Sequence, residues 1–156
     1  MAFNYNSGIH NVGSYQVSGR PFVTGSEARV GQEYKINFPK VTKSITVIFS
    51  GSAGAKGING VDLGDTDCLR VYFARTASQD PITPGERHYI TLGGHGESVT
   101  FDIKCKEIFI GCVTEQANEA APYIGYEVFA ELTNIDVGSM YSHTGSGISH
   151  AWTGSW

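Results

Sequence analysis

The chain has 156 residues, of which 20 are glycine, 17% are charged and 12% are aromatic. This length predicts a single domain, and abundant glycine with few charges is typical of short strands joined by tight turns. The formal net charge of −4 argues against nucleic acid or an anionic membrane as a direct partner, since both demand a basic surface.

Alternation of apolar and polar residues predicts seven or eight short strands. The first, at residues 15–24, is interrupted by Gly19 and Pro21, so we expect it at a sheet edge. The apolar faces of the strands that follow are, in chain order, Tyr34, Ile36 and Phe38; Ile45, Val47 and Phe49; Leu69, Val71 and Phe73; His88, Ile90 and Leu92; Val99, Phe101 and Ile103; Ile108 and Ile110; and Tyr126, Val128, Ala130 and Leu132. A slip in the alternation at residues 104–106 indicates a bulge or a turn.

Turn-like stretches separate these strands at residues 51–60, 80–85, 93–96 and 114–122, and residues 115–121 have the composition of a helical turn. Eight antiparallel strands of this length are typical of a jelly roll, with an immunoglobulin-like sandwich as the alternative. The immunoglobulin order of Cys, Trp and Cys is absent, because both tryptophans lie near the C-terminus. We therefore predict an all-β fold, an antiparallel jelly-roll or related β-sandwich with extended N- and C-terminal arms.

The charges divide the chain into three parts, because all of them except Arg20 lie between Glu27 and Asp136. We predict an N-terminal arm with an edge strand at residues 1–26, a β-sandwich body at 27–136 and a C-terminal arm at 137–156. Passive tails are the alternative, but disordered tails are normally charged and poor in aromatic residues. Neutral arms suit pairing with strand edges, while aromatic side chains fill pockets. The predicted partner-binding residues are Phe3, Tyr5, Tyr15, Arg20, Phe22, Tyr141, Trp152 and Trp156.

The three cysteines, Cys68, Cys105 and Cys112, show no CxxC spacing. We predict reduced, buried thiols rather than a metal site or a disulfide framework, which fits folding in a reducing cytoplasm. If residues 105–112 were one unbroken strand, Cys105 and Cys112 would point to opposite faces. No segment reaches the length of a membrane span, and the N-terminal residues lack the pattern of a secretory signal.

Two groups of side chains resemble ligand sites. The loop at residues 59–67 carries the oxygen ligands that Ca²⁺ uses, but its spacing is not that of an EF-hand, and a solvated turn is the favoured interpretation. Its candidate ligands are Asn59, Asp62, Asp65 and Asp67. The second group, His88, His95 and Glu97, suggests a cupin metal site, yet its histidines lie seven residues apart where the cupin pattern has them one residue apart.

The common catalytic motifs G-x-S-x-G, H-E-x-x-H and G-x-x-x-x-G-K-[ST] are absent from the sequence. The carboxylates are spread over the predicted strands and loops, so no pair can be singled out for acid–base catalysis. We therefore expect no enzymatic activity, no metal and no cofactor.

Residues 11–26 read Asn-Val-Gly-Ser-Tyr-Gln-Val-Ser-Gly-Arg-Pro-Phe-Val-Thr-Gly-Ser, and the strand-like residues 36–47 follow them. Together they resemble small virion structural proteins of tailed bacteriophages, of the type of the head decoration (cement) proteins of marine and cyanobacterial phages. The resemblance covers about the first fifty residues.

This resemblance implies a jelly-roll or sandwich protein that is made in the host cytoplasm and becomes part of the virion. There it would dock on an icosahedral shell as a homo-oligomer, with its arms linking neighbours. The implied partners are the major capsid protein and copies of the chain itself. Because 156 residues are few for the main shell protein of such phages, an accessory role follows.

The sequence thus predicts a non-enzymatic virion structural protein, a capsid decoration or cement protein. Three alternatives stay open. A carbohydrate-binding module or lectin would use aromatic platforms and the loop at residues 59–67, and a cupin-like enzyme would use His88, His95 and Glu97. Within a virion, the chain could instead be a tail or fibre component.

Overall fold

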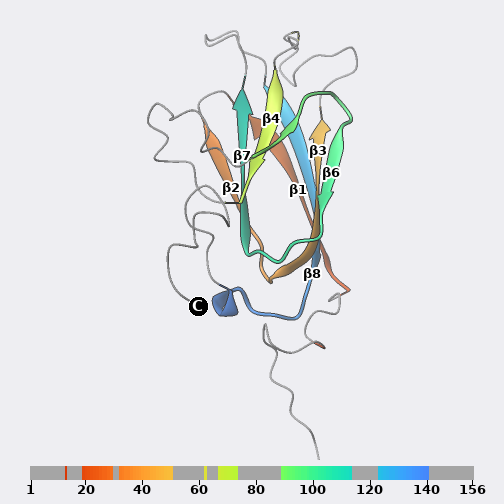
Figure 1. Cartoon of the computed structure of the whole chain (residues 1–156), viewed down its shortest axis with the longest axis vertical. Helices are drawn as coiled ribbons and strands as arrows, with labels where there is room; N and C mark the ends of the chain where they lie inside the picture. The colour runs from red at the N-terminus through yellow and green to blue at the C-terminus, as the bar shows by residue number, and fades with distance from the viewer. Residues whose placement is uncertain are drawn as a thin grey trace, which may run out of the picture.

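The computed structural model describes residues 13, 19–29, 32–50, 62, 67–73, 89–113 and 123–140. Within these ranges the chain forms eight β-strands and a short 3-10 helix, η2 (Figure 1). Their bounds are β1 (Pro21–Ala28), β2 (Glu33–Asn37), β3 (Thr42–Ser50), β4 (Cys68–Tyr72), β5 (Ile90–Leu92), β6 (Ser98–Phe101), β7 (Glu107–Val113), β8 (Ile124–Leu132) and η2 (Val137–Ser139). The predicted all-β fold is confirmed. The predicted turns at residues 51–60, 80–85 and 114–122, and the helical turn at 115–121, lie outside the described residues.

The strands form two four-stranded antiparallel sheets, in the orders β1-β8-β3-β6 and β2-β7-β4-β5 (Figure 1). Their pairing is nested: β1 pairs with β8, β2 with β7, β3 with β6, and β4 with β5. The pairs β3–β8 and β4–β7 complete the two sheets. β1 begins at Pro21 and lies at an edge of its sheet, which is a position that tolerates proline because an edge strand leaves N–H groups unpaired.

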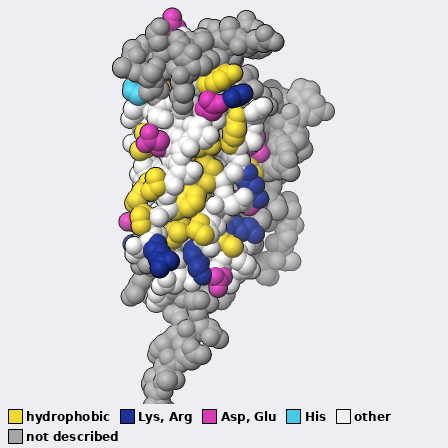
Figure 2. Space-filling model, turned by 180° about the vertical axis from the view of Figure 1, so that it is seen from behind, with side chains coloured by type: hydrophobic (Ala, Val, Ile, Leu, Met, Phe, Trp, Pro, Cys, Tyr) yellow, Lys and Arg dark blue, Asp and Glu magenta, His cyan; other side chains and the backbone are white. Residues whose placement is uncertain are grey.

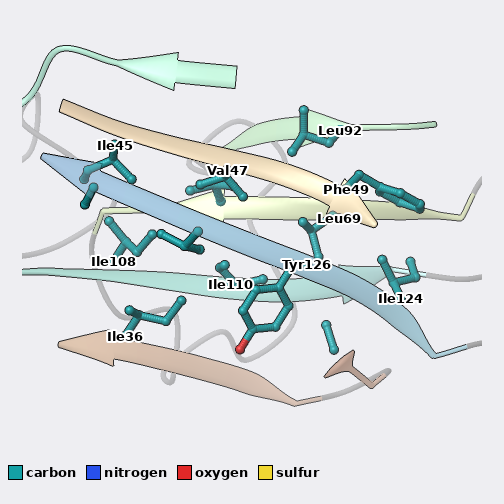
Figure 3. Packing of buried hydrophobic residues seen from close by; sticks show 14 of the residues in the cluster. Ile36, Ile45, Val47, Phe49, Leu69, Leu92, Ile108, Ile110, Ile124 and Tyr126 are labelled. Atoms are coloured by element: carbon teal, nitrogen blue, oxygen red, sulfur yellow. The ribbon is translucent and has the colours of Figure 1, made fainter. Parts of the chain in front are cut away.

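The hydrophobic core lies between the two sheets, so the arrangement is β-sandwich-like. Side chains at alternate positions of a strand share a face, and the inward positions of β3 and β7 are almost completely buried. Figure 3 shows that Ile45 and Val47 of β3 lie in the same core layer as Ile108 and Ile110 of β7. Each large aliphatic side chain buried in this way contributes about 1.5–3 kcal/mol. The described members of the predicted apolar faces contact this core or belong to it, except Ile90, which is 43% exposed.

The slip predicted at residues 104–106 is the crossing between the two sheets. β6 belongs to the first sheet and β7 to the second, and residues 102–106 between them are outside any strand. The crossing moves the inward positions from odd to even residue numbers. Cys105 and Cys112 therefore both reach the same core cluster, instead of the opposite faces expected for an unbroken strand. The prediction of free, buried thiols is confirmed for Cys68 as well as for these two.

A second, smaller cluster extends the packed body beyond β8. Val41, Ile135 and Met140 are buried against one another. The N–H of Val41 donates to the carbonyl of Ile135 at 3.0 Å, and the hydroxyl of Thr133 donates to the carbonyl of Val41 at 2.7 Å. Residues 137–140, which the sequence assigned to the C-terminal arm, therefore include a core side chain. The arm residues 1–12, 14–18 and 141–156 lie outside the described ranges.

The turn between β5 and β6 requires a glycine at one position. Gly96 has φ 83°, and its N–H donates to the carbonyl of Phe49 at 2.9 Å. Substitution of Gly96 by alanine is expected to lower the free energy of unfolding by about 1 kcal/mol, because a Cβ disfavours the left-handed region. Gly93→Ala is the matched control: a Cβ meets no atom within 4 Å at either position, and only Gly96 has a positive φ. Urea denaturation of both variants checks this, and equal losses would contradict it.

Candidate protein-docking surface

The outward face of the β1-β8-β3-β6 sheet carries two of the three exposed large hydrophobic side chains among the described residues. Val23 of β1 is 70% exposed and Phe129 of β8 is 40% exposed. The register places them directly opposite each other, and Thr46 of β3 lies on the other side of Phe129. Directly opposite residues of antiparallel strands have side chains in contact range. Val23 and Phe129 therefore form one apolar surface, which we name the Val23–Phe129 pair.

Most side chains around this pair are polar, with Pro21 and Ile48 as the apolar neighbours. The hydroxyl oxygens of Thr46 and Thr100 are 2.8 Å apart, which extends the same row to β6 at the far edge. In the next row toward the start of β1, Pro21 lies opposite Glu131, and the Ser44 hydroxyl donates to the Glu131 carboxylate at 2.9 Å. Ile48, two residues beyond Thr46, lies diagonally next to Phe129 and is half-buried. Figure 2, seen from behind, shows hydrophobic side chains in a broken band with charged groups at its margins.

Two hollows lie at the two ends of β1. The first, of about 460 Å³, is at the N-terminal end of β1; its lining residues are Arg20, Pro21, Phe22, Pro39, Lys40, Leu132, Thr133 and Asn134. The second, of about 480 Å³, is at the C-terminal end; its lining residues are Gly25, Ser26, Glu27, Ser50, Tyr126 and Glu127. The charged side chains of the first lining are basic and those of the second are acidic. We name them the basic hollow and the acidic end for these linings, although Asp136, ion-paired with Lys40, and Arg29, ion-paired with Glu27, offset part of each charge.

The charges near the acidic end are fixed at neutral pH. Nε of Arg29 donates to Oε1 of Glu27 at 3.0 Å, and its guanidinium lies 4.5 Å from the ring centre of Tyr123. The hydrogen bond and the charge of Glu27 raise the pKa of Arg29. Burial raises the pKa of Tyr126, whose hydroxyl is hydrogen-bonded with Ser26. Arg29 thus stays a cation and Tyr126 stays neutral around pH 7.

On the outward face of the other sheet, several side chains pack against one another. The guanidinium of Arg70 lies 4.2 Å from the ring centre of Tyr89, and Tyr72 packs edge-on against the same ring at 5.8 Å. Nζ of Lys35 lies 5.8 Å from the ring centre of Phe109. Phe109 is 3% exposed. The outward aromatic side chain of this sheet is thus buried, whereas Phe129 of the first sheet is 40% exposed.

Of the eight predicted partner-binding residues, two are described. Arg20 is exposed, and Phe22 is half-buried at the edge of the core, with its ring 5.2 Å from and nearly perpendicular to that of Phe38. Both line the basic hollow, so the structure brings them together. Phe22 is thereby also a packing residue of the sandwich. The other predicted residues, Phe3, Tyr5, Tyr15, Tyr141, Trp152 and Trp156, lie outside the described residues.

The two possible ligand sites are described only in part. In the loop at residues 59–67, Asp62 is exposed and Asp67 is buried just before β4, whereas Asn59 and Asp65 lie outside the described residues. A group of three or more His, Cys, Asp or Glu side chains placed to hold a metal ion is not found in the described part of the chain.

Glu97 of the possible cupin set has a structural role. Its Oε2 accepts hydrogen bonds from the N–H groups of Gly93 at 2.7 Å and Gly94 at 3.3 Å, so it closes the β5–β6 turn. His95 is exposed in the same turn, and His88 lies outside the described residues.

Sequence reasoning did not select Val23 or Phe129. A signal was present for Phe129, because it stands between Glu127 and Glu131 on the polar side of the alternation in β8. An aromatic residue at a polar position of a clean pattern marks a candidate contact residue. No such signal marks Val23, whose exposure depends on its pairing with β8.

Comparisons of the chain with family models, with curated proteins and with solved structures found no match. In the described residues there is no helix with the length and apolar character needed to cross a membrane.

Proposed function

We propose that this chain is a non-enzymatic structural protein of a virion, a capsid decoration or cement protein that binds the shell and copies of itself. The observation that carries the proposal is the Val23–Phe129 pair, whose side chains are 70% and 40% exposed on the outward face of the β1-β8-β3-β6 sheet. Clustered exposed apolar side chains with a polar rim are typical of protein interfaces. Aromatic anchors in such interfaces contribute about 2 kcal/mol or more each when fully desolvated.

The strand order supports assignment to the jelly rolls. Nested pairing in the orders β1-β8-β3-β6 and β2-β7-β4-β5 is what results when one long antiparallel hairpin is rolled into two facing sheets. Two Greek keys of this kind make a jelly roll, an architecture used by viral capsid and lectin domains. The resemblance of residues 11–26 to phage head decoration proteins favours the viral class.

The test uses an antibody against the purified chain and virions assembled from the same genome. We expect the antibody to label intact heads in negative-stain electron micrographs. Label on the tail would identify a tail or fibre component instead. Particles without label, together with a specific signal on a glycan array, would overturn the proposal in favour of a lectin.

Deletion of residues 141–156 is expected to leave a folded body that no longer binds heads stripped of the protein. The deletion retains Met140, so the cluster with Val41 and Ile135 is kept, while the aromatic residues Tyr141, Trp152 and Trp156 are lost. Co-sedimentation with stripped heads measures binding, and thermal unfolding checks the body. Unchanged binding would contradict a role for this arm.

The matched control is a deletion that begins at residue 137. It also removes Met140 from the small cluster, and loss of a buried methionine side chain costs about 2–5 kcal/mol. We expect this longer deletion to lower the melting temperature. The shorter one should not change it.

A further inference from the structure

Among the arginines in the described part of the chain, Arg70 of β4 alone makes no hydrogen bond and no ion pair; Arg29 pairs with Glu27, and Arg20 has a partner too. Arg70 is half-buried on the β2-β7-β4-β5 sheet, and its Nε is a buried donor without an acceptor in the described residues. A buried donor of a charged group is costly when it is left unsatisfied. This arginine therefore has the charge and the donors for a partner that the described chain does not supply.

Aromatic stacking holds the guanidinium of Arg70 in place. Its Cζ lies 4.2 Å from the ring centre of Tyr89, and Tyr72 packs edge-on against that ring at 5.8 Å. Tyr72 lies over Gly111, where an added Cβ would be 3.3 Å from the Tyr72 ring. Stacking occupies the face of a guanidinium, while its N–H donors lie in the plane and point sideways. The arginine is thus positioned before any partner binds, which lowers the entropic cost of binding.

The other described charges on this sheet face do not neutralise Arg70. Nζ of Lys35 and a carboxylate oxygen of Glu107 are paired with each other at 2.7 Å. Glu33 lies two strands away from Arg70, because β7 stands between β2 and β4, and neighbouring strands are about 4.8 Å apart. Directly beside Arg70 on β5 is Thr91, which is exposed. The face therefore presents one uncompensated guanidinium with a hydroxyl next to it.

We propose that Arg70 and Tyr89 anchor an acidic peptide segment of a partner protein, whose carboxylate accepts hydrogen bonds from the Arg70 guanidinium. The planar donors of a guanidinium match the two oxygens of a carboxylate. Arginine and tyrosine are also enriched among the residues that dominate binding at protein interfaces. We name these two residues the Arg70–Tyr89 anchor.

The charge and shape of the surface favour this occupant over other anions. Nucleic acids and other polyanions bind where several cations act together, whereas the Arg70–Tyr89 anchor supplies a single positive charge. Small-molecule sites are concave, and the two hollows described above lie at the ends of β1, on the other sheet. A peptide carboxylate matches the single charge, and its backbone extends the contact over the flanking Thr91.

The test titrates the chain with a capped oligoglutamate peptide at low ionic strength, with capped oligoglutamine and inorganic phosphate as the comparison probes. Because Nε of Arg70 is buried, its N–H exchanges slowly with water and its NMR signal can be followed. We expect oligoglutamate to shift this signal, and the two comparison probes to leave it in place. No shift with oligoglutamate would overturn the proposal, and an equal shift with phosphate would overturn the choice of a carboxylate.

Arg29→Lys is the matched control for Arg70→Lys. Arg29 also stacks on an aromatic ring, with its Cζ 4.5 Å from the ring centre of Tyr123, but it is ion-paired with Glu27. Lysine keeps the charge and lacks the planar donors, so Arg70→Lys is expected to raise the dissociation constant of oligoglutamate about tenfold. Arg29→Lys should leave it unchanged. Calorimetric titration measures both, and equal losses would show unspecific attraction to positive charge and overturn the proposal.

Tyr89→Leu separates the position of the guanidinium from its charge. It retains Arg70 and removes the stacked ring, so we expect the dissociation constant to rise roughly threefold. Thermal unfolding checks that the variant is folded, and wild-type binding by a folded variant would contradict the part assigned to Tyr89. The inference does not rest on the virion function: labelling of heads by the antibody tests that function alone, and the titrations test the Arg70–Tyr89 anchor alone.

Discussion

Replacement of Thr42 by valine is expected to lower the free energy of unfolding by about 2 kcal/mol, although the two side chains have nearly the same shape. Thr42 is completely buried. Its Oγ1 donates to the carbonyl of Ile103 at 2.8 Å and accepts from the N–H of Cys105 at 3.1 Å. Valine would leave the buried N–H of Cys105 and the partly buried carbonyl of Ile103 without this partner, and an unsatisfied buried polar group costs about 1–3 kcal/mol.

This hydroxyl therefore connects the first residue of β3 by hydrogen bonds to residues 102–106, the segment that crosses between the two sheets. The backbone bond from the N–H of Thr42 to the carbonyl of Cys105, at 3.0 Å, reinforces the same contact. Thr46→Val is the matched control, because the hydroxyl of Thr46 bonds to that of Thr100 at an exposed position. There we expect a change within about 0.5 kcal/mol. Urea denaturation of both variants measures the difference, and equal effects would show that the buried hydroxyl is not needed.

The strands were predictable because the signal for them is local. In β3, Ile45, Val47 and Phe49 alternate with polar or partly exposed residues, and burial on one side of a sheet is sufficient to fix that pattern. The slip before β7 was equally visible. The structural cause of the slip could not be predicted, because a break in alternation looks the same for a bulge, a turn or a crossing between sheets. Only the pairing of β6 with β3 and of β7 with β2 and β4 distinguishes these.

The candidate docking surface could not be predicted in the same way. Val23 and Phe129 belong to the first and the last strand, and they meet because β1 pairs with β8. No local pattern specifies which strands pair or which edge stays open. Charge placement did identify the neutral segments at both ends of the sequence, but it could not separate Met140, a core residue, from the uncharged residues that follow it.

Stability is expected to fall at alkaline pH, because the core holds thiols whose pKa is higher in the folded chain than in the unfolded chain. Burial raises the pKa of the Cys105 thiol from 9.0 to about 11, and that of Cys112 to about 12. A group whose pKa is raised by folding contributes stability that is complete below its unfolded pKa and is lost as the pH rises through its folded pKa. The loss therefore begins near pH 9 and continues to about pH 11 for Cys105, and further for Cys112.

Ionisation of Cys105 is expected to lower the free energy of unfolding by about 1.4 kcal/mol per pH unit across that window, or by about 2–3 kcal/mol in total. Urea denaturation in the presence of reductant, at intervals between about pH 8 and 11, measures it. Cys105→Ala should be less stable than wild type at pH 8, because a core side chain is truncated, but its stability should decline less with pH. The lysines and tyrosines that also titrate here are common to both proteins, so the difference between the two slopes isolates the thiol. Parallel declines would mean that Cys105 titrates equally in the folded and unfolded chain, and that its burial does not protect it from ionisation.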